Sequence, residues 1–124
     1  MLIGMVTDTA MKLFICGLVW HWFADWILQN AWMAENKASL KHPAAYIHSG
    51  IHLIGLLLIF PPLAAVAIAL IHLLIDIRVP LVAWRNIFRQ TRSGPMAAHV
   101  AIWGDQVCHI TVLAVAALII GGLH

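Results

Sequence analysis

The chain is 124 residues long, is 63% hydrophobic and carries a charge on only 10% of its residues. Soluble domains have roughly 25% charged residues, and a soluble chain of this length leaves much of its surface exposed, so the composition excludes an ordinary soluble domain. The formal net charge of +2 is too small to indicate a nucleic-acid partner. We therefore expect one compact domain in a membrane, in contact with lipids.

The first apolar segment, residues 11–28, is predicted to be a spanning helix, because about 20 mostly apolar residues cross a bilayer. It does not resemble a cleavable signal peptide, since Asp8 precedes it and Lys12 lies inside it. We expect this segment to be retained in the mature protein.

Three further segments are predicted to span the membrane, at residues 44–60, 63–79 and 98–121. The second segment ends at Pro61 and Pro62, because proline breaks a helix, and the fourth ends at Gly121 and Gly122. We expect an all-α, integral-membrane four-helix bundle that forms a single domain over residues 1–124.

Between the third and fourth segments lies a basic stretch that is predicted to form a short helix in the headgroup region. Trp84, Ile87 and Phe88 fall on one side of such a helix, whereas Arg85 and Arg89 lie one turn apart. This distribution is typical of an amphipathic helix on a membrane surface. A solvated loop with scattered arginines is the alternative.

Basic residues are distributed unevenly between the two sides of the predicted bundle. Those on the side of the first and third connections are Lys37, Lys41, Arg78, Arg85, Arg89 and Arg92. The other side has only Lys12, and the positive-inside rule makes the first side cytoplasmic. We expect a multi-pass protein of the bacterial inner (cytoplasmic) membrane with both termini on the outer, periplasmic side.

Four pairs of metal-binding residue types are spaced i to i+4, one pair in each predicted span. The pairs are His21/Asp25, His48/His52, His72/Asp76 and Asp105/His109. Residues at i and i+4 share a helix face, and the predicted topology places all four pairs in one layer of the cytoplasmic half. An ionised Asp at the bilayer centre costs about 2.5–3.5 kcal/mol on insertion scales, so three of them in one layer require a cation.

We therefore predict that these eight residues bind divalent metal ions, two per chain. Histidine and carboxylate ligands suit zinc, our first choice, and also manganese or iron. An interhelical hydrogen-bond network without metal is the alternative. Gln29, which continues the face of His21 and Asp25, and Gln106, beside Asp105, are predicted to contact the ligands or a substrate.

Five short motifs are distributed over most of the length of the chain. They are His21-x-x-x-Asp25-Trp26-x-Leu28-Gln29, Met33-Ala34-x-x-Lys37, His48-x-x-x-His52, His72-x-x-x-Asp76 and Asp105-Gln106-x-x-His109. Together they resemble a family of small bacterial and phage membrane proteins of unknown function, and this resemblance implies no activity. In style, the His/Asp pairs are also similar to bacterial inner-membrane metal-dependent hydrolases.

The function that we predict is hydrolysis by a metal-activated water near the cytoplasmic leaflet, on a lipid or lipid-linked phosphoester. Two metal ions about 3.5–4 Å apart activate a bridging water and hold the oxygens of a phosphoester. Arg78, Arg85 and Arg89 would receive the phosphate. Asp105 or His109 would also serve as the catalytic base.

Other functions are compatible with the same residues. The two His-x-x-x-Asp motifs are similar to the intramembrane zinc site of cation-efflux transporters, although four short spans give little material for alternating access unless the chain dimerises. A haem protein would use two facing histidines and leave the three Asp unexplained. A structural metal site is a further alternative. Small residues such as Gly50 and Gly55 suit packing within the bundle or in a homo-oligomer.

Overall fold

The computed structural model describes residues 3–90 and 93–123, and every regular element in this part of the chain is helical. The longer helices are α1 (Asp8–Phe23), α3 (Pro43–Ile59), α4 (Pro62–Asp76) and α6 (Ala97–Gly122). The shorter elements are a 3₁₀ turn η1 (Ile3–Met5), a π-helical segment η2 (Ala24–Leu28), α2 (Ala31–Asn36) and α5 (Val79–Ile87).

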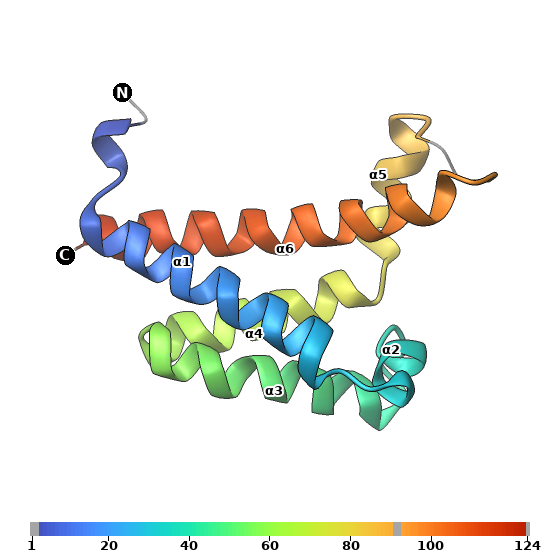
Figure 1. Cartoon of the computed structure of the whole chain (residues 1–124), viewed down its shortest axis with the longest axis horizontal. Coiled ribbons are helices and arrows are strands. Elements are labelled where there is room, and N and C mark those ends of the chain that lie inside the picture. Colours follow the sequence, from blue (N-terminus) through green and yellow to red (C-terminus); the bar gives the residue numbers. More distant parts are fainter. Residues whose placement is uncertain (1–2, 91–92, 124) are drawn as a thin grey trace.

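The longer helices form two side-by-side pairs, α1 with α6 and α3 with α4 (Figure 1). Both chain ends and the α3–α4 turn lie at one end of the molecule, whereas α2 and α5 lie at the other. Thr7 Oγ1 donates to the Gly121 carbonyl at 3.2 Å, and a Cβ atom on Gly121 would meet the backbone of Ala10. Ser49 Oγ donates to the Ala69 carbonyl at 2.9 Å and joins the second pair.

Two segments are long and apolar enough to cross a membrane by their length and composition, Asp8–Leu28 and Ala97–Gly122. The helices α4 and α5, which are bent by 61° relative to each other, make a third if they are taken as one span. The helix α3 is apolar but has 17 residues. A membrane protein with two to three candidate spans is therefore supported, and four spans remain a prediction.

The helix boundaries follow local sequence signals. Thr7 caps α1, because its side chain accepts a hydrogen bond from the Ala10 amide at 3.0 Å, so the first helix begins earlier than residue 11. The third helix ends at Asp76 instead of residue 79, because Arg78 adopts a left-handed conformation (φ 65°) and the chain turns there into α5. The predicted short helix between the third and fourth segments is present as α5.

An apolar core fills the space between the four longer helices on the side of the chain ends. Its buried residues are Leu56, Phe60, Ala65, Ile68, Ala69, Leu113 and Ala117. Gly17 lies where the side chains of Phe60 and Leu113 approach α1 most closely. This core leaves the other half of the helices for polar residues.

Candidate metal centre

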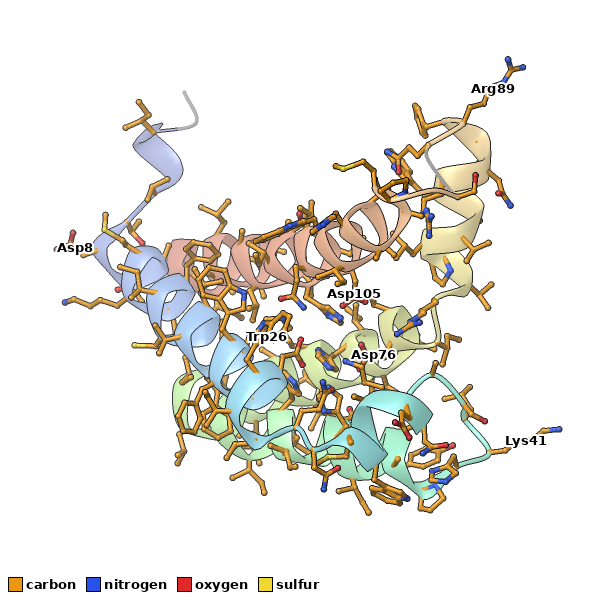
Figure 2. All side chains as sticks on the ribbon, turned by 45° about the vertical axis from the view of Figure 1, so that its right-hand side comes forward. Asp8, Trp26, Lys41, Asp76, Arg89 and Asp105 are labelled. Carbon is orange, nitrogen blue, oxygen red and sulfur yellow. The ribbon has the colours of Figure 1, made fainter. Side chains whose placement is uncertain are left out.

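The eight predicted ligands come together between the four longer helices. They are His21, Asp25, His48, His52, His72, Asp76, Asp105 and His109. All are buried except Asp105, whose side chain is 18% exposed. Asp76 and Asp105 face the space between α4 and α6, whereas Lys41 and Arg89 extend away from the molecule (Figure 2). The opening of the cluster is therefore at Asp105.

Asp25 reaches the cluster from an irregular part of the first span. It lies in η2, where α1 continues as a π-helical turn, and such turns frequently occur at functional sites. One turn earlier, the Trp20 indole Nε1 donates to the His52 carbonyl at 3.0 Å. The Trp20 ring lies directly against Gly55, so that no side chain fits at residue 55. This contact fixes the first span against α3.

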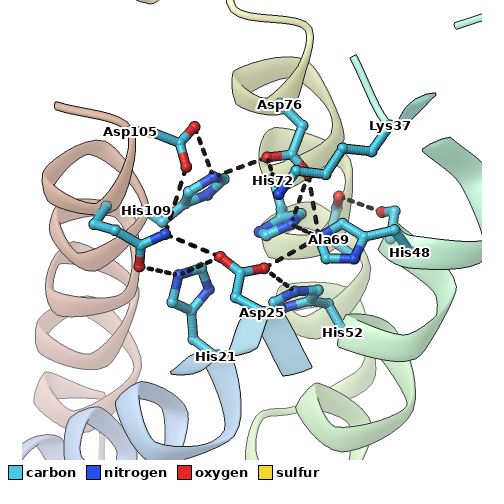
Figure 3. Close-up of polar contacts among 12 residues, drawn as sticks. His21, Asp25, Lys37, His48, His52, Ala69, His72, Asp76, Asp105 and His109 are labelled. Atoms are coloured by element: carbon cyan, nitrogen blue, oxygen red, sulfur yellow. Dashed lines mark hydrogen bonds and ion pairs between the residues drawn. The ribbon is translucent and has the colours of Figure 1, made fainter. Parts of the chain in front are cut away.

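The two oxygens of Asp25 have different neighbours (Figure 3). Asp25 Oδ1 lies 2.9 Å from His52 Nε2 and 3.1 Å from His48 Nε2. Asp25 Oδ2 accepts a hydrogen bond from Gln106 Nε2 at 3.0 Å, and Gln106 Oε1 accepts one from His21 Nε2 at 3.2 Å. The carboxamide of Gln106 thereby orients two ligands and leaves Oδ1 of Asp25 toward the histidines.

Asp76 lies between two groups of ligands. Its Oδ2 atom is 3.0 Å from His72 Nε2 and 3.4 Å from His48 Nε2. Its Oδ1 atom is 3.2 Å from His109 Nε2, which is in turn 3.5 Å from Asp105 Oδ1. A carboxylate with this arrangement suits the bridging position of a two-metal site, because each oxygen faces a separate set of ligands.

Some histidine nitrogen atoms have more close neighbours than one N–H group serves with good geometry. His48 Nε2 lies near both Asp25 and Asp76, and it is also 3.2 Å from His72 Nε2. One ring nitrogen carries at most one proton, so His48 donates to only one of these three neighbours. Ligands at about 2.0–2.1 Å from a tetrahedral zinc ion lie about 3.3 Å from each other. The observed distances are compatible with neighbouring ligands around a shared cation.

The candidate ligand atoms form three sets, and the atoms within each set lie within 4.8 Å of one another. The inner set is Asp25, His48, His52 and His72, the middle set is His21, His72 and His109, and the outer set is Asp76, Asp105 and His109. A cavity of about 10 Å³, with room for about one water molecule, lies between the histidine rings and the apolar core. These residue types and distances suit zinc, manganese or iron.

One residue of the cluster was not predicted from the sequence. Lys37 is buried, and its Nζ atom lies 3.7 Å from Asp76 Oδ1. Lys37 follows α2, whose residue Met33 is also buried, and the i, i+4 spacing of these two residues was the available signal. In the sequence, Lys37 is recognisable as a basic residue of the first connection and as part of a family motif. Its contact with the cluster is not, because its distance from the cluster depends on how α2 packs against α3.

The other predicted residues lie farther out. Gln29 follows η2, and its Oε1 atom is buried with no hydrogen-bond partner among the described residues. Arg78 and Arg89 are exposed, and the described contacts of the cluster include neither of them. Arg85 is half-buried on α5. These arginines would contact a substrate at the rim of the site and not beside the metal ligands.

Two grooves lie on the surface near this part of the molecule. A groove of about 820 Å³ lies between α4, α5 and α6, where Trp84, Trp103 and Arg89 are among its lining residues. A second groove of about 500 Å³ lies between the first span and α6 and ends on Gln106, with Trp22 and Trp26 among its walls. Their mostly apolar walls fit lipid chains.

Residues 13–123 match the family described as "Protein of unknown function (DUF3307)". The chain belongs to this family. This result confirms the predicted membership of a family of unknown function. No curated protein and no solved structure matches the chain. The description of DUF3307 names no reaction, so the function of this member has to be argued from its site.

Proposed function

We propose that this DUF3307 protein is a four-helix transmembrane bundle that acts as a metal-dependent hydrolase. Its His/Asp cluster would bind two divalent ions, with zinc as the first choice and manganese or iron as alternatives. The substrate would be a lipid or lipid-linked phosphoester at the cytoplasmic leaflet of the membrane.

The observation that carries the proposal is the convergence of five histidine Nε2 atoms on buried carboxylates. A hydrogen-bond network satisfies His48 poorly, because its single Nε2 proton faces two carboxylates and the ring nitrogen of His72. Buried charges in proteins are paired or coordinate metals. The position of Asp76 between the inner and outer sets supports two ions instead of one.

The outer set supports a hydrolytic role, because catalytic metal sites keep an open position. Asp105 is the partly exposed member of the cluster, and it lies beside His109. Bound ions would lower the pKa of a water that attacks phosphorus while the bond to the alkoxide breaks, and the leaving alkoxide would receive the proton that the base takes from this water. Asp105 or His109 would accept the proton of the attacking water.

The surroundings support a lipid substrate. The groove between α4, α5 and α6 combines the apolar Trp84 and Trp103 with Arg89, which suits an acyl chain with an anionic headgroup. On the opposite side of the cluster, Leu56 and Leu113 lie against the histidines as part of the apolar core. Among the described residues, the cluster therefore opens on one side only. Such an opening favours hydrolysis over transport through the protein, and transport is the second candidate function.

The test is phosphate release from lipid phosphoesters in mixed micelles by the zinc- or manganese-loaded protein. We expect Asp105→Asn to lower the rate by about 10²–10⁴-fold, the usual effect of losing a general base, while the protein stays folded. Asp8→Asn, at an exposed residue at the start of α1, is the matched control and should keep full activity. Metal movement into proteoliposomes without turnover would instead support the transporter.

A further inference from the structure

Lys37 adds a positive charge to the outer part of the cluster. Its ammonium group is buried beside Asp76 Oδ1, the same oxygen that faces His109. Lysines are almost never fully buried unless they are paired. The inner set, in contrast, has Asp25 as its single charged ligand. The positive charge of Lys37 therefore balances one negative charge of the outer set. The negative charge of the inner set is left for a metal ion to balance.

The charges of the cluster limit how many ions it holds. Asp25, Asp76 and Asp105 contribute three negative charges, Lys37 contributes one positive charge, and histidines that bind a metal are neutral. The sum of −2 is cancelled by one divalent ion. A second ion leaves a charge of +2 in a buried site, which is strongly unfavourable unless an anion enters with it.

We infer that the second metal ion binds only together with a dianionic oxyanion, and that the substrate class is a phosphate monoester. This inference rests on the proposed function. The first ion occupies the inner set of Asp25, His48, His52 and His72. The second would be held by the outer set of Asp76, Asp105 and His109, and Lys37 would turn from Asp76 to the oxyanion that enters with this ion. A phosphodiester carries only one negative charge, so the site with two ions would keep a charge of +1.

The experiment measures metal bound per chain by equilibrium dialysis and elemental analysis of the whole protein in mild detergent, titrated with zinc. Four conditions are compared: no added anion, inorganic phosphate, phosphatidate in the micelles, and phosphatidylglycerol in the micelles. We expect about one ion per chain without phosphate. With a monoester we expect a second ion whose affinity rises at least about tenfold, a typical coupling between linked sites.

These conditions distinguish a monoester that is part of a lipid headgroup from phosphate that enters from water. Binding of the second ion with phosphatidate but not with inorganic phosphate identifies the lipid headgroup as the ligand, and binding with both shows a site open to water. Either result supports the inference. Two ions without any anion, an effect of phosphatidylglycerol equal to that of phosphatidate, or one ion under all conditions would overturn it.

Variants of Lys37 test its role. Lys37→Met changes the sum of charges to −3, so that two ions leave a charge of +1. A phosphodiester would cancel this charge, so the second ion should bind with phosphatidylglycerol as well as with phosphatidate, whereas Lys37→Arg should keep the requirement for a monoester. Lys41→Met is the matched control, because Lys41 is exposed in the same connection and extends away from the molecule. A folded Lys37→Met protein that still requires a phosphate monoester would contradict the inference. Because binding is measured, absence of turnover would refute the proposed hydrolase but not this coupling.

Discussion

At the scale of single residues, His48 has the central position in the His/Asp cluster. It is fully buried on α3, and its Nε2 atom faces the carboxylates of Asp25 and Asp76. Those two carboxylates come from the first span and from α4. One imidazole therefore connects three of the four longer helices, and its surroundings are compatible with a shared metal ion.

We expect His48→Ala to remove the stabilisation of the protein by zinc. In the wild type, added zinc should raise the unfolding temperature, because a ligand that binds only the folded state stabilises it. Without zinc, the variant should lose about 3–5 kcal/mol, the usual effect of removing one partner from a buried charged pair. The measurement is thermal unfolding in detergent with zinc and with chelator.

The control for this variant is His99→Ala, at an exposed histidine near the start of α6. It should keep the full response to zinc. If zinc raised the unfolding temperature of the His48 variant as much as that of the wild type, His48 would not be a ligand.

At the scale of elements, the site depends on how the first span is held against α3. Trp20 contacts Gly55 through its ring and donates to the carbonyl of His52, which is one of the proposed ligands. The contact between these helices therefore sets the position of His52. Metal binding and helix packing should respond together to changes at this contact.

We expect Gly55→Ala to destabilise the protein by about 1–3 kcal/mol, the usual cost of overpacking, and to weaken metal binding. The new methyl group would occupy the place of the Trp20 ring and break its hydrogen bond to His52. Thermal unfolding and zinc titration of the same preparations provide both measurements.

Gly50→Ala is the matched control, because it lies on the same helix and a Cβ atom there meets no atom within 4 Å. It should leave zinc binding unchanged and hold or raise the unfolding temperature, since alanine favours helix more than glycine. Equal behaviour of the two variants would show that the Trp20 contact does not control the site.

For the whole molecule, the helices could be predicted from the sequence because hydrophobic length and i, i+4 pairing are local properties. The pairs such as His72 and Asp76 define helix faces without any knowledge of tertiary contacts. The end of α4 was misplaced, because the apolar run continues past Asp76 and nothing before Pro80 signals the left-handed Arg78.

The remaining features of the site depend on packing between distant segments. The π-helical turn at Asp25 contains ordinary helix-forming residues, so no local pattern predicts it. Lys37 reaches Asp76 across 39 positions of sequence only because α2 packs against α3. Such distances are set by tertiary contacts and not by the local sequence.

The distribution of basic residues leads to a prediction about orientation. We expect a cysteine at residue 41 to be protected from a membrane-impermeant thiol reagent in intact spheroplasts, and a cysteine at residue 8 to be labelled. Both variants would be made with Cys16 and Cys108 replaced by serine. Labelling of residue 41 and protection of residue 8 would reverse the orientation.

The central claim is that the His/Asp cluster of this membrane protein binds metal. It is tested most directly by elemental analysis of the wild-type protein, purified in mild detergent without added metal or chelator. We predict at least about one zinc, manganese or iron ion per chain, as expected for a buried set of histidine and carboxylate ligands. A well-folded protein without stoichiometric metal, which also fails to take up zinc on titration, would contradict the claim.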